Sequence, residues 1–288
     1  MRSAAAFAAL LLAAACATPV PEASHAHGTA ATPAIPIEVL KPAGSGPFPA
    51  VVMLHDCSGL GPRSSGAPRR WARELLAHGY VVAIPDSFGS RGFPNGVCTD
   101  PSPSRIDVAP FRRVADAYDA LDHLRTLPYV DGKRIGVMGG SHGGSSTLAA
   151  IAISPRDPER LARRKREGFA AAIALYPACA IGNPPFTRQF TAGARLLILA
   201  GELDDWTPAA PCKALVEAAR GGSPASIKVY PGAHHSFDNA SLLRYVPERM
   251  NPNAPGGRGA TTAGNREAWA DSIQEVTAFF AKHLGGAP

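Results

Sequence analysis

The chain has 288 residues, of which 45% are hydrophobic and 18% charged, an ordinary composition for a globular protein that excludes a disordered one. This length suits one large α/β domain or two small ones. Its 29 Lys and Arg residues exceed its 23 Asp and Glu residues by only 6, and so small a surplus serves solubility. Because no zinc-finger, RNA-binding or basic-helix pattern accompanies this charge, we do not expect nucleic acid as a partner.

Residues 1–17 have the pattern of an export signal. Arg2 supplies a positive charge, and an uncharged apolar run extends from Ala4 to Ala15, too short to cross a bilayer as a mature helix. The segment ending at Cys16 resembles a bacterial lipobox, which would place a membrane-anchoring lipid on Cys16. Alternatively, residues 15–17 form an ordinary signal-peptidase site. Both alternatives predict an exported protein, either periplasmic, with or without that anchor, or secreted.

Residues 18–34 are rich in Ala, Pro, His and Thr and show no apolar periodicity, which predicts a flexible tether. His25 and His27 lie within it. Two histidines in a flexible segment are weak metal ligands, so we interpret them as solvated linker residues.

From residue 35 onward, strand and helix patterns alternate. We expect strands at 35–40, 50–55, 80–85, 134–138, 169–176, 195–200 and 226–230, and helices at 71–78, 111–127, 145–151, 209–220 and 265–284. Continuous apolar runs such as 50–55 are typical of strands that are buried on both faces. Strands separated by helices predict an α/β fold, with a mostly parallel twisted sheet, helices on both of its faces and right-handed crossovers. We assign residues 35–288 to a single domain.

Two segments stand apart from this alternation. Residues 155–167 are rich in basic side chains, among them Arg160, Arg163, Arg164, Lys165 and Arg166. This pattern favours a solvated helix face over a patch for anionic lipid or substrate. Residues 239–262 are rich in Pro, Gly and Asn. Such a long loop could shape or cover a pocket, or it could be disordered.

The most informative motif is Gly139-Gly140-Ser141-His142-Gly143-Gly144, between an expected strand and an expected small-residue helix. A serine on such a turn is held at a strained, exposed corner, where the helix N-terminus favours a developing negative charge. Gly139 and Gly143 are needed because a Cβ atom would collide across so tight a turn. The alternative is a glycine-rich helix start that merely contains a serine. The context and two downstream partners favour Ser141 as a nucleophile.

A serine hydroxyl is a poor nucleophile at neutral pH, so it needs a base, which in turn needs an acid to fix its tautomer. In α/β-hydrolases the chain order is serine, acid, histidine. The candidates, each just past an expected strand, are Asp204 and Asp205 and then His234 and His235. Neighbouring histidines point in different directions and rarely share one metal ion, and no spaced cluster of ligands accompanies them. We therefore expect no metal site, and nothing indicates a cofactor.

Ester hydrolysis at Ser141 would pass through an oxyanion, whose stabilisation is often the largest electrostatic contribution to catalysis. One donor should be the backbone N–H of His142, directly after the nucleophile. The second should come from the loop after the strand at 50–55, where the N–H of Cys57 is the candidate.

Four cysteines besides Cys16 are an even number in a chain expected to reach an oxidising compartment. In the expected fold Cys57 and Cys98 follow adjacent strands, as do Cys179 and the segment of Cys212. We therefore predict the pairs Cys57–Cys98 and Cys179–Cys212. The alternative is four free buried thiols that act as small hydrophobic groups.

Together these features resemble the dienelactone hydrolase family over about residues 35 to 285. The resemblance is carried by the Ser141 motif, His55-Asp56, Pro85 to Gly92, Asp204 and His235-Ser236-Phe237. It implies the α/β-hydrolase fold. The family pattern places the acid three residues after a glycine and four before a proline, which selects Asp204, and its His-small-Phe ending selects His235. Asp205 then belongs to a helix start, and His234 to the rim or the structure.

Members of the founding type have a cysteine nucleophile and a nearby glutamate, whereas this chain has Ser141 and Asp56 at those positions. The resemblance therefore points to a serine-dependent esterase branch, with Asp56 in the substrate site. It also implies that Arg91 grips a substrate carboxylate through a bidentate pair. Because Arg91 is one residue out of register with the founding pattern, a loop arginine that ties down neighbouring carbonyls is the alternative.

The sequence thus predicts an exported serine-dependent hydrolase of carboxylic esters or lactones that acts through an acyl-enzyme on a small molecule. Its motif also resembles that of prolyl oligopeptidases, but this chain has no residues for their propeller domain. A third hypothesis is a non-catalytic envelope protein that binds a ligand on the same fold. A complete set of nucleophile, base, acid and oxyanion donors argues against it, because binding alone requires no such set.

Overall fold

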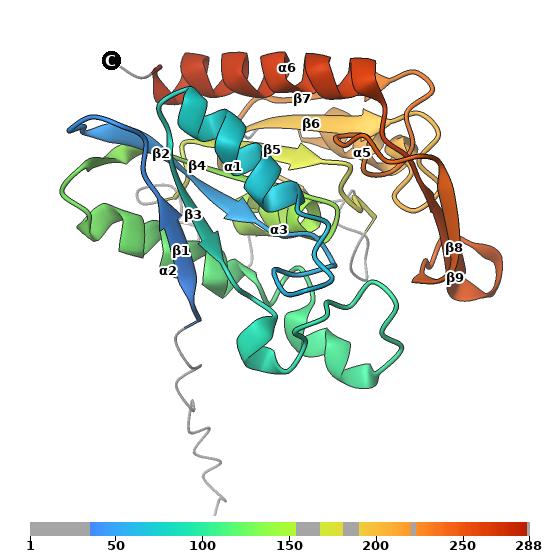
Figure 1. Cartoon of the computed structure of the whole chain (residues 1–288). Coiled ribbons are helices and arrows are strands. Elements are labelled where there is room, and N and C mark those ends of the chain that lie inside the picture. The colour runs from blue at the N-terminus through green and yellow to red at the C-terminus, as the bar shows by residue number, and fades with distance from the viewer. Residues whose placement is uncertain (1–34, 154–167, 181–189, 220–222, 287–288) are drawn as a thin grey trace, which may run out of the picture. The chain divides into compact units, whose positions relative to one another are not determined.

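A computed structural model of the chain describes residues 35–153, 168–180, 190–219 and 223–286. The expected export signal and tether, Cys16 and the whole basic segment 155–167 lie outside these residues. The described residues form a seven-stranded sheet of order β1-β3-β2-β4-β5-β6-β7 (Figure 1). Its strands are β1 (Ile37–Leu40), β2 (Phe48–Leu54), β3 (Val81–Pro85), β4 (Val130–Gly140), β5 (Ala171–Leu175), β6 (Arg195–Gly201) and β7 (Ala225–Tyr230).

The sheet is mostly parallel, as the sequence predicts. Only β1 of these seven strands runs antiparallel to its neighbour, β3. All seven residues of β2 are buried, which explains its continuous apolar sequence. The registers pair Leu54 with Gly139 and Gly140 with Leu175, so the ends of β2, β4 and β5 lie at one edge of the sheet.

Helices cover both faces of this sheet (Figure 1). They are α1 (Ala67–Ala77), α2 (Val114–Thr126), α3 (His142–Ile151), α5 (Ala209–Ala218) and α6 (Arg266–Leu284). One apolar core lies between the sheet and α2, α3 and α5, with Leu121, Leu148 and Leu215 among its members. A second core lies between the opposite face and α1 and α6, where Trp71 and Phe280 are buried. The α/β fold class expected from the sequence is confirmed.

Residues 239–262, expected as a loop or a disordered segment, contain an antiparallel hairpin of β8 (Arg244–Met250) and β9 (Arg258–Thr262). Pro247 obscures the strand pattern, because proline cannot donate to a strand ladder. The pairing register shifts between Val246 and Met250, on either side of this proline. The 3-10 turn η4 (Pro255–Gly257) connects the two strands.

Element boundaries differ from the expected ones by a few residues. The helix expected at 111–127 begins at Val114, with Arg113 as its wholly buried N-cap residue. Two 3-10 turns, η1 (Gly89–Arg91) and η2 (Pro103–Val108), lie between β3 and α2. These turns and the hairpin bring irregular segments to the sheet edge where β2 and β4 end.

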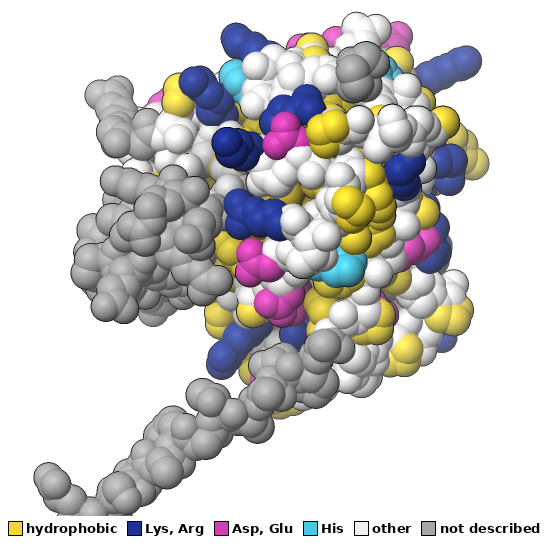
Figure 2. All heavy atoms as spheres, turned by 90° about the vertical axis from the view of Figure 1, so that its left-hand side faces the viewer, with side chains coloured by type: hydrophobic (Ala, Val, Ile, Leu, Met, Phe, Trp, Pro, Cys, Tyr) yellow, Lys and Arg dark blue, Asp and Glu magenta, His cyan; other side chains and the backbone are white. Residues whose placement is uncertain are grey.

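On the face shown in Figure 2, Lys and Arg side chains lie among acidic and apolar ones rather than in one continuous basic surface. This distribution is the one expected of a small charge surplus that serves solubility. None of the helices built from described residues is both long and apolar enough to span a membrane.

Candidate active site

Ser141 lies on the sharp turn between β4 and α3. Its φ of 53° and ψ of −117° are a strained conformation for a residue with a side chain, and it is the N-cap residue of α3. The turn requires glycine on both sides of the serine. A Cβ atom on Gly143 would lie 2.0 Å from the carbonyl oxygen of Leu54, and one on Gly139 would lie 2.5 Å from the carbonyl carbon of Gly143. Close packing of the turn against β2 therefore explains the motif.

The turns after β6 and β7 bring two further side chains to Ser141. His235 Nε2 lies 2.9 Å from Ser141 Oγ, and His235 Nδ1 lies 2.8 Å from Asp204 Oδ2. Both Asp204 and His235 are buried. These are the serine, the acid and the histidine selected from the sequence, and β6 and β7 place them together because they are neighbouring parallel strands.

Asp204 is held in its orientation by the turn that follows it. Its Oδ1 accepts hydrogen bonds from the backbone N–H groups of Trp206 (3.0 Å) and Thr207 (2.7 Å). Thr207 Oγ1 lies 2.9 Å from Asp204 Oδ2 and 3.0 Å from His235 Nδ1. Asp205 points elsewhere, because its carboxylate accepts from the backbone N–H and the hydroxyl of Thr261 on β9.

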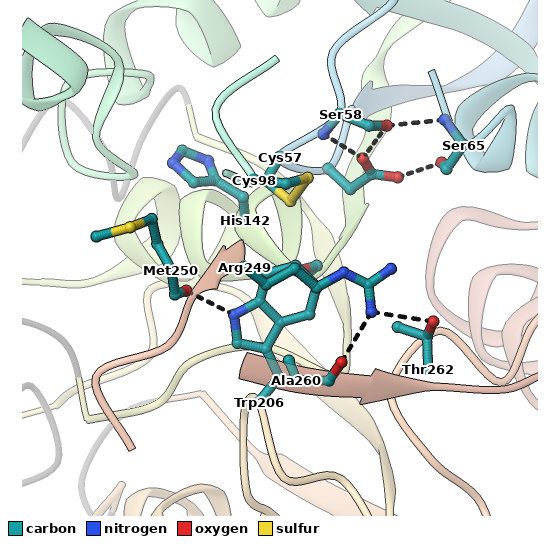
Figure 3. The surroundings of a disulfide bond; sticks show 12 residues. Cys57, Ser58, Ser65, Cys98, His142, Trp206, Arg249, Met250, Ala260 and Thr262 are labelled. Atoms are coloured by element: carbon teal, nitrogen blue, oxygen red, sulfur yellow. Dashed lines mark hydrogen bonds between the residues drawn. A yellow bond between two sulfur atoms is a disulfide. The ribbon is translucent and has the colours of Figure 1, made fainter. Parts of the chain in front are cut away.

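Two aromatic rings pack against the imidazole of His235. The ring centroids of Tyr176 and of Trp206 each lie 4.8 Å from the ring centroid of His235. Trp206 is anchored by the hairpin, since its Nε1 donates to the carbonyl of Met250 at 2.9 Å and the guanidinium of Arg249 lies 4.8 Å from its ring (Figure 3). Restricting the imidazole on two sides fixes its orientation toward Ser141.

The two proposed oxyanion donors lie on neighbouring segments. His142 is the first residue of α3, and the first N–H groups of a helix have no acceptor within it. Cys57 follows β2, whose end pairs with β4, and no described residue accepts a hydrogen bond from its N–H.

Disulfides join Cys57 to Cys98 and Cys179 to Cys212, the two pairings expected from the sequence. Figure 3 shows the first of them beside His142.

A cavity of about 530 Å³ opens at Ser141. Its wall is mostly apolar and includes Val97, Pro101, Ile106, Ala178, Trp206 and Met250. Among the described residues that line it, Arg105 is the only charged one. Apolar cavities of this size with a few polar groups are typical binding sites for small organic molecules.

A strained serine, a buried histidine and a buried acid at the mouth of an apolar cavity are the arrangement of an α/β-hydrolase. The family model of the dienelactone hydrolases matches residues 35–284. The chain belongs to the dienelactone hydrolase family. It is therefore an ester-bond hydrolase.

Solved structures of dienelactone hydrolase-like proteins have the same α/β-hydrolase fold. Esterase 2 of Thermogutta terrifontis, phosphorylated by paraoxon, is 18% identical with a TM-score of 0.60, and the match covers 88% of this chain and 90% of that one. A dienelactone hydrolase-like promiscuous phosphotriesterase from metagenomic libraries is 19% identical with a TM-score of 0.58, covering 87% and 99%.

Arg91, which the resemblance places in the substrate site, is engaged elsewhere in this dienelactone hydrolase family member. Its guanidinium binds both carboxylate oxygens of Asp116, at 2.7 and 2.6 Å, and donates to the carbonyl of Ser87. It does not line the cavity of Ser141. In this structure the guanidinium fork that a substrate carboxylate would need is paired with Asp116, and Arg91 has the contacts of the alternative, a loop arginine that ties down neighbouring groups.

Asp56 is likewise bound within its own loop. Its carboxylate accepts hydrogen bonds from the backbone N–H of Ser58, at 2.7 Å, and from the hydroxyls of Ser58 and Ser65. It does not line the cavity either. These hydrogen bonds make Asp56 part of what shapes the loop that carries Cys57, and they occupy the carboxylate that the resemblance places in the substrate site. His234 lies outside the cavity wall too, and its Nδ1 is buried without a hydrogen-bond partner among the described residues.

A buried polar cluster that sequence reasoning missed lies behind the oxyanion segments. Arg113 donates from Nη1 to the carbonyl of His55 and to Nδ1 of His142, both at 2.9 Å. Its Nε and Nη2 are buried without a partner among the described residues, and Phe88 lies 5.0 Å from the guanidinium. Burial lowers the pKa of Arg113 to about 10. In the sequence, Arg113 is one charged residue at the start of an expected helix, and nothing in its neighbourhood distinguishes it from a solvent-exposed arginine. The sequence therefore carries no signal for this cluster.

Proposed function

We propose that the protein hydrolyses carboxylic esters or lactones through a covalent acyl-enzyme on Ser141. The observation that carries this proposal is the hydrogen-bonded chain from Ser141 Oγ through His235 to Asp204, with distances of 2.9 and 2.8 Å, at an apolar cavity. An activated hydroxyl, a base and an orienting acid within hydrogen-bond reach are the parts that nucleophilic catalysis needs.

In the first half-reaction, Ser141 Oγ attacks the ester carbonyl carbon while its proton passes to His235 Nε2. The C=O π electrons move to the carbonyl oxygen, and the N–H groups of Cys57 and His142 stabilise the oxyanion. Asp204 stabilises the imidazolium that forms and keeps the Nδ1 proton in place. The oxyanion then collapses, the bond to the leaving oxygen breaks, and His235 donates the proton to that oxygen. The products are an alcohol and acyl-Ser141.

In the second half-reaction, water replaces the alcohol. His235 Nε2 accepts a proton from the water as its oxygen attacks the acyl carbon. The second oxyanion forms at the same donors, and its collapse breaks the bond to Ser141 Oγ, which takes the proton back from His235. The carboxylic acid leaves and the free enzyme returns. A lactone follows the same steps, except that its alcohol and acid remain in one molecule.

Turnover of p-nitrophenyl butyrate by wild type and Ser141→Ala tests the proposal. We expect hydrolysis by the wild type and a loss of at least about 10³-fold in the variant. We also expect paraoxon to inactivate the wild type and to leave a diethylphosphoryl group on the peptide that contains Ser141. Undiminished turnover in Ser141→Ala would overturn the assignment. Cleavage of peptide amides without ester turnover would favour a peptidase, and binding without turnover of either would favour a binding protein.

We also propose that the protein is exported, on the strength of the signal pattern in residues 1–17. The two disulfides support an oxidising compartment, because such bonds rarely persist in the cytosol. Expression of the full chain in a Gram-negative host, followed by fractionation and intact mass measurement, tests this. A lipid on Cys16 would identify a lipoprotein, and a chain that begins at residue 18 an ordinary cleaved signal. A cytoplasmic chain that retains residues 1–17 would contradict export.

A further inference from the structure

His142 occupies a wall of the cavity directly beside the nucleophile. It follows Ser141 as the first residue of α3, it is partly buried, and it lines the cavity. Its ring packs edge-on against Phe88 with the centroids 5.4 Å apart, and it lies beside the disulfide of Cys57 (Figure 3). The mechanism uses only the backbone N–H of this residue, so its imidazole has no role assigned so far.

The contact with Arg113 fixes which nitrogen of this imidazole carries the proton. Arg113 Nη1 lies 2.9 Å from His142 Nδ1. A guanidinium has only donors, so Nδ1 must present its lone pair to it. A neutral imidazole with a lone pair on Nδ1 carries its proton on Nε2, and the ring is thereby a hydrogen-bond donor at Nε2.

The same surroundings keep the ring neutral. Protonation would place a second positive charge against the buried guanidinium of Arg113. Burial first, and then the charge of Arg113, lower the pKa of His142 well below its usual range. His55 also faces Arg113, and burial and the charge of Arg113 lower its pKa in the same way. It therefore offers no charge that would favour protonation of His142. The donor at Nε2 is therefore uncharged, and it suits a neutral oxygen as well as an anionic one.

The other polar side chains of this wall already have partners. Ser145 Oγ bonds with the carbonyl of Ser141 and the N–H of Ala178, and Thr207 belongs to the site of Asp204. Asn253 donates to the carbonyl of Trp206. In contrast, no other described residue accepts a hydrogen bond from His142 Nε2. An oxygen of a bound molecule would supply that acceptor.

We propose that His142 determines substrate specificity, by donating from Nε2 to a second oxygen of the substrate close to the scissile ester. This proposal rests on the proposed function, because it places the substrate at Ser141. It names the substrate class as esters that carry an ether, hydroxyl or carbonyl oxygen near the ester group, on the acyl or the alcohol side. Purely aliphatic esters of the same size are then poorer substrates, since they cover this donor in the cavity without offering it an acceptor.

Two pairs of esters in which one CH₂ is replaced by oxygen test the proposal. On the acyl side these are p-nitrophenyl butyrate and p-nitrophenyl methoxyacetate, and on the alcohol side butyl acetate and 2-methoxyethyl acetate. The measured quantity is the ratio of kcat/KM for the oxygen ester to that for its carbon analogue. Dividing the ratio of a variant by that of the wild type cancels the intrinsic reactivity of the two esters.

His142→Leu removes the donor, and we expect it to lower this ratio about five- to tenfold in at least one pair. His142→Gln retains an N–H donor, and we expect it to keep the ratio within about twofold of wild type. The matched control is His123→Leu at the exposed end of α2, which should leave the ratio unchanged. If His142→Leu does not fold, as judged by thermal unfolding, His142→Met replaces it.

Equal loss of rate on both members of each pair in His142→Leu would overturn the proposal, because a merely structural role of the ring predicts that result. A ratio in His142→Gln as low as in His142→Leu would overturn it too. Failure of the proposed function looks different: the wild type would hydrolyse none of the four esters, or Ser141→Ala would hydrolyse them as fast as the wild type.

Discussion

Cys57 and Cys98 are joined by a disulfide, and both residues line the cavity that contains Ser141. The carbonyl of Cys57 accepts from the N–H of Val97 at 2.7 Å, and the carbonyl of Cys98 accepts from the N–H of Met250 at 2.9 Å. The bond therefore links the loop that carries a proposed oxyanion donor to the hairpin that anchors Trp206. An oxyanion hole stabilises the transition state because its donors are held in position before the reaction. A covalent link that holds the loop of Cys57 should therefore affect the rate of ester hydrolysis as well as the stability of the fold.

We predict that the double variant Cys57→Ala/Cys98→Ala has a kcat about tenfold lower on p-nitrophenyl butyrate than the wild type. Loss of the link allows the N–H of Cys57 to move, and displacement of an oxyanion donor costs part of the 10²- to 10³-fold that such a donor contributes. The effect should fall on kcat more than on KM, because the donor acts on the oxyanion rather than on the bound ester.

The second disulfide is a matched control. The pairs Cys57–Cys98 and Cys179–Cys212 close loops with sequence separations of 41 and 33 residues, so the chain-entropy model assigns each a similar stabilisation, about 4 kcal/mol. Cys179 and Cys212 do not line the cavity. Cys179→Ala/Cys212→Ala should lose comparable stability in urea unfolding while kcat stays within about twofold of wild type. Equal losses of kcat in the two double variants would contradict the role of the first bond.

The adjacent carboxylates of Asp204 and Asp205 should differ sharply in their effect on rate. Asp204 contacts His235 Nδ1 at 2.8 Å, whereas Asp205 contacts Thr261. We predict that Asp204→Asn lowers kcat by about 10³-fold or more, because an amide neither stabilises the imidazolium nor selects the productive tautomer. Asp205→Asn should lower kcat by less than about tenfold. Steady-state kinetics with a short-chain p-nitrophenyl ester would measure both losses of kcat. A larger loss in Asp205→Asn than in Asp204→Asn would make Asp205 the catalytic acid instead of Asp204.

The sequence predicted the parallel sheet and the elements that carry Ser141, Asp204 and His235 because these depend on local signals. Continuous apolar strands, a glycine turn and polar residues at strand ends are all visible in a single sequence. The register of parallel strands then brings the strand ends together. Both disulfide pairings followed from the same reasoning, since adjacent strands bring their following loops within reach of each other.

The partners of Arg91, Arg113 and Asp56 could not be predicted in this way. Each side chain is fixed by contacts between segments far apart in the chain or by the detailed course of a loop. Arg91 pairs with a carboxylate 25 residues further on, and Arg113 reaches a histidine 29 residues away. Charged residues of this kind carry no periodic signal, and a family motif cannot show whether a guanidinium is free. The hairpin was missed for a related reason, because Pro247 interrupts its first strand.

Arg91 should therefore contribute to stability rather than to substrate charge selection. Its side chain is 18% exposed and that of Asp116 is 2% exposed, so Arg91→Ala leaves a buried carboxylate without its partner. We predict a loss of about 3 kcal/mol in the free energy of unfolding, measured with urea. The relative kcat/KM for an anionic and a neutral ester should stay unchanged. A selective loss on the anionic ester would restore the carboxylate grip that the resemblance implies.

The buried histidines beside Arg113 should make the protein less stable in mild acid. Burial and the charge of Arg113 lower the pKa of both His55 and His142 in the folded state, whereas the unfolded chain has ordinary histidines with a pKa near 6.5. Below that pH the unfolded state binds more protons than the folded state, so the free energy of unfolding falls as the pH decreases. The loss amounts to about 1 kcal/mol for each histidine between pH 6 and pH 5.

Comparison of variants isolates this effect from the other groups that titrate, including Asp238, whose pKa burial raises and which acts in the opposite direction. In His142→Leu the folded and unfolded states no longer differ at this position. We predict that its loss of stability between pH 6 and pH 5 is about 1 kcal/mol smaller than that of the wild type, by urea unfolding at each pH. The exposed control His123→Leu should retain the wild-type dependence. An unchanged dependence in His142→Leu would mean that His142 titrates normally in the folded protein, and its imidazole would then not be the neutral donor that the contact with Arg113 requires.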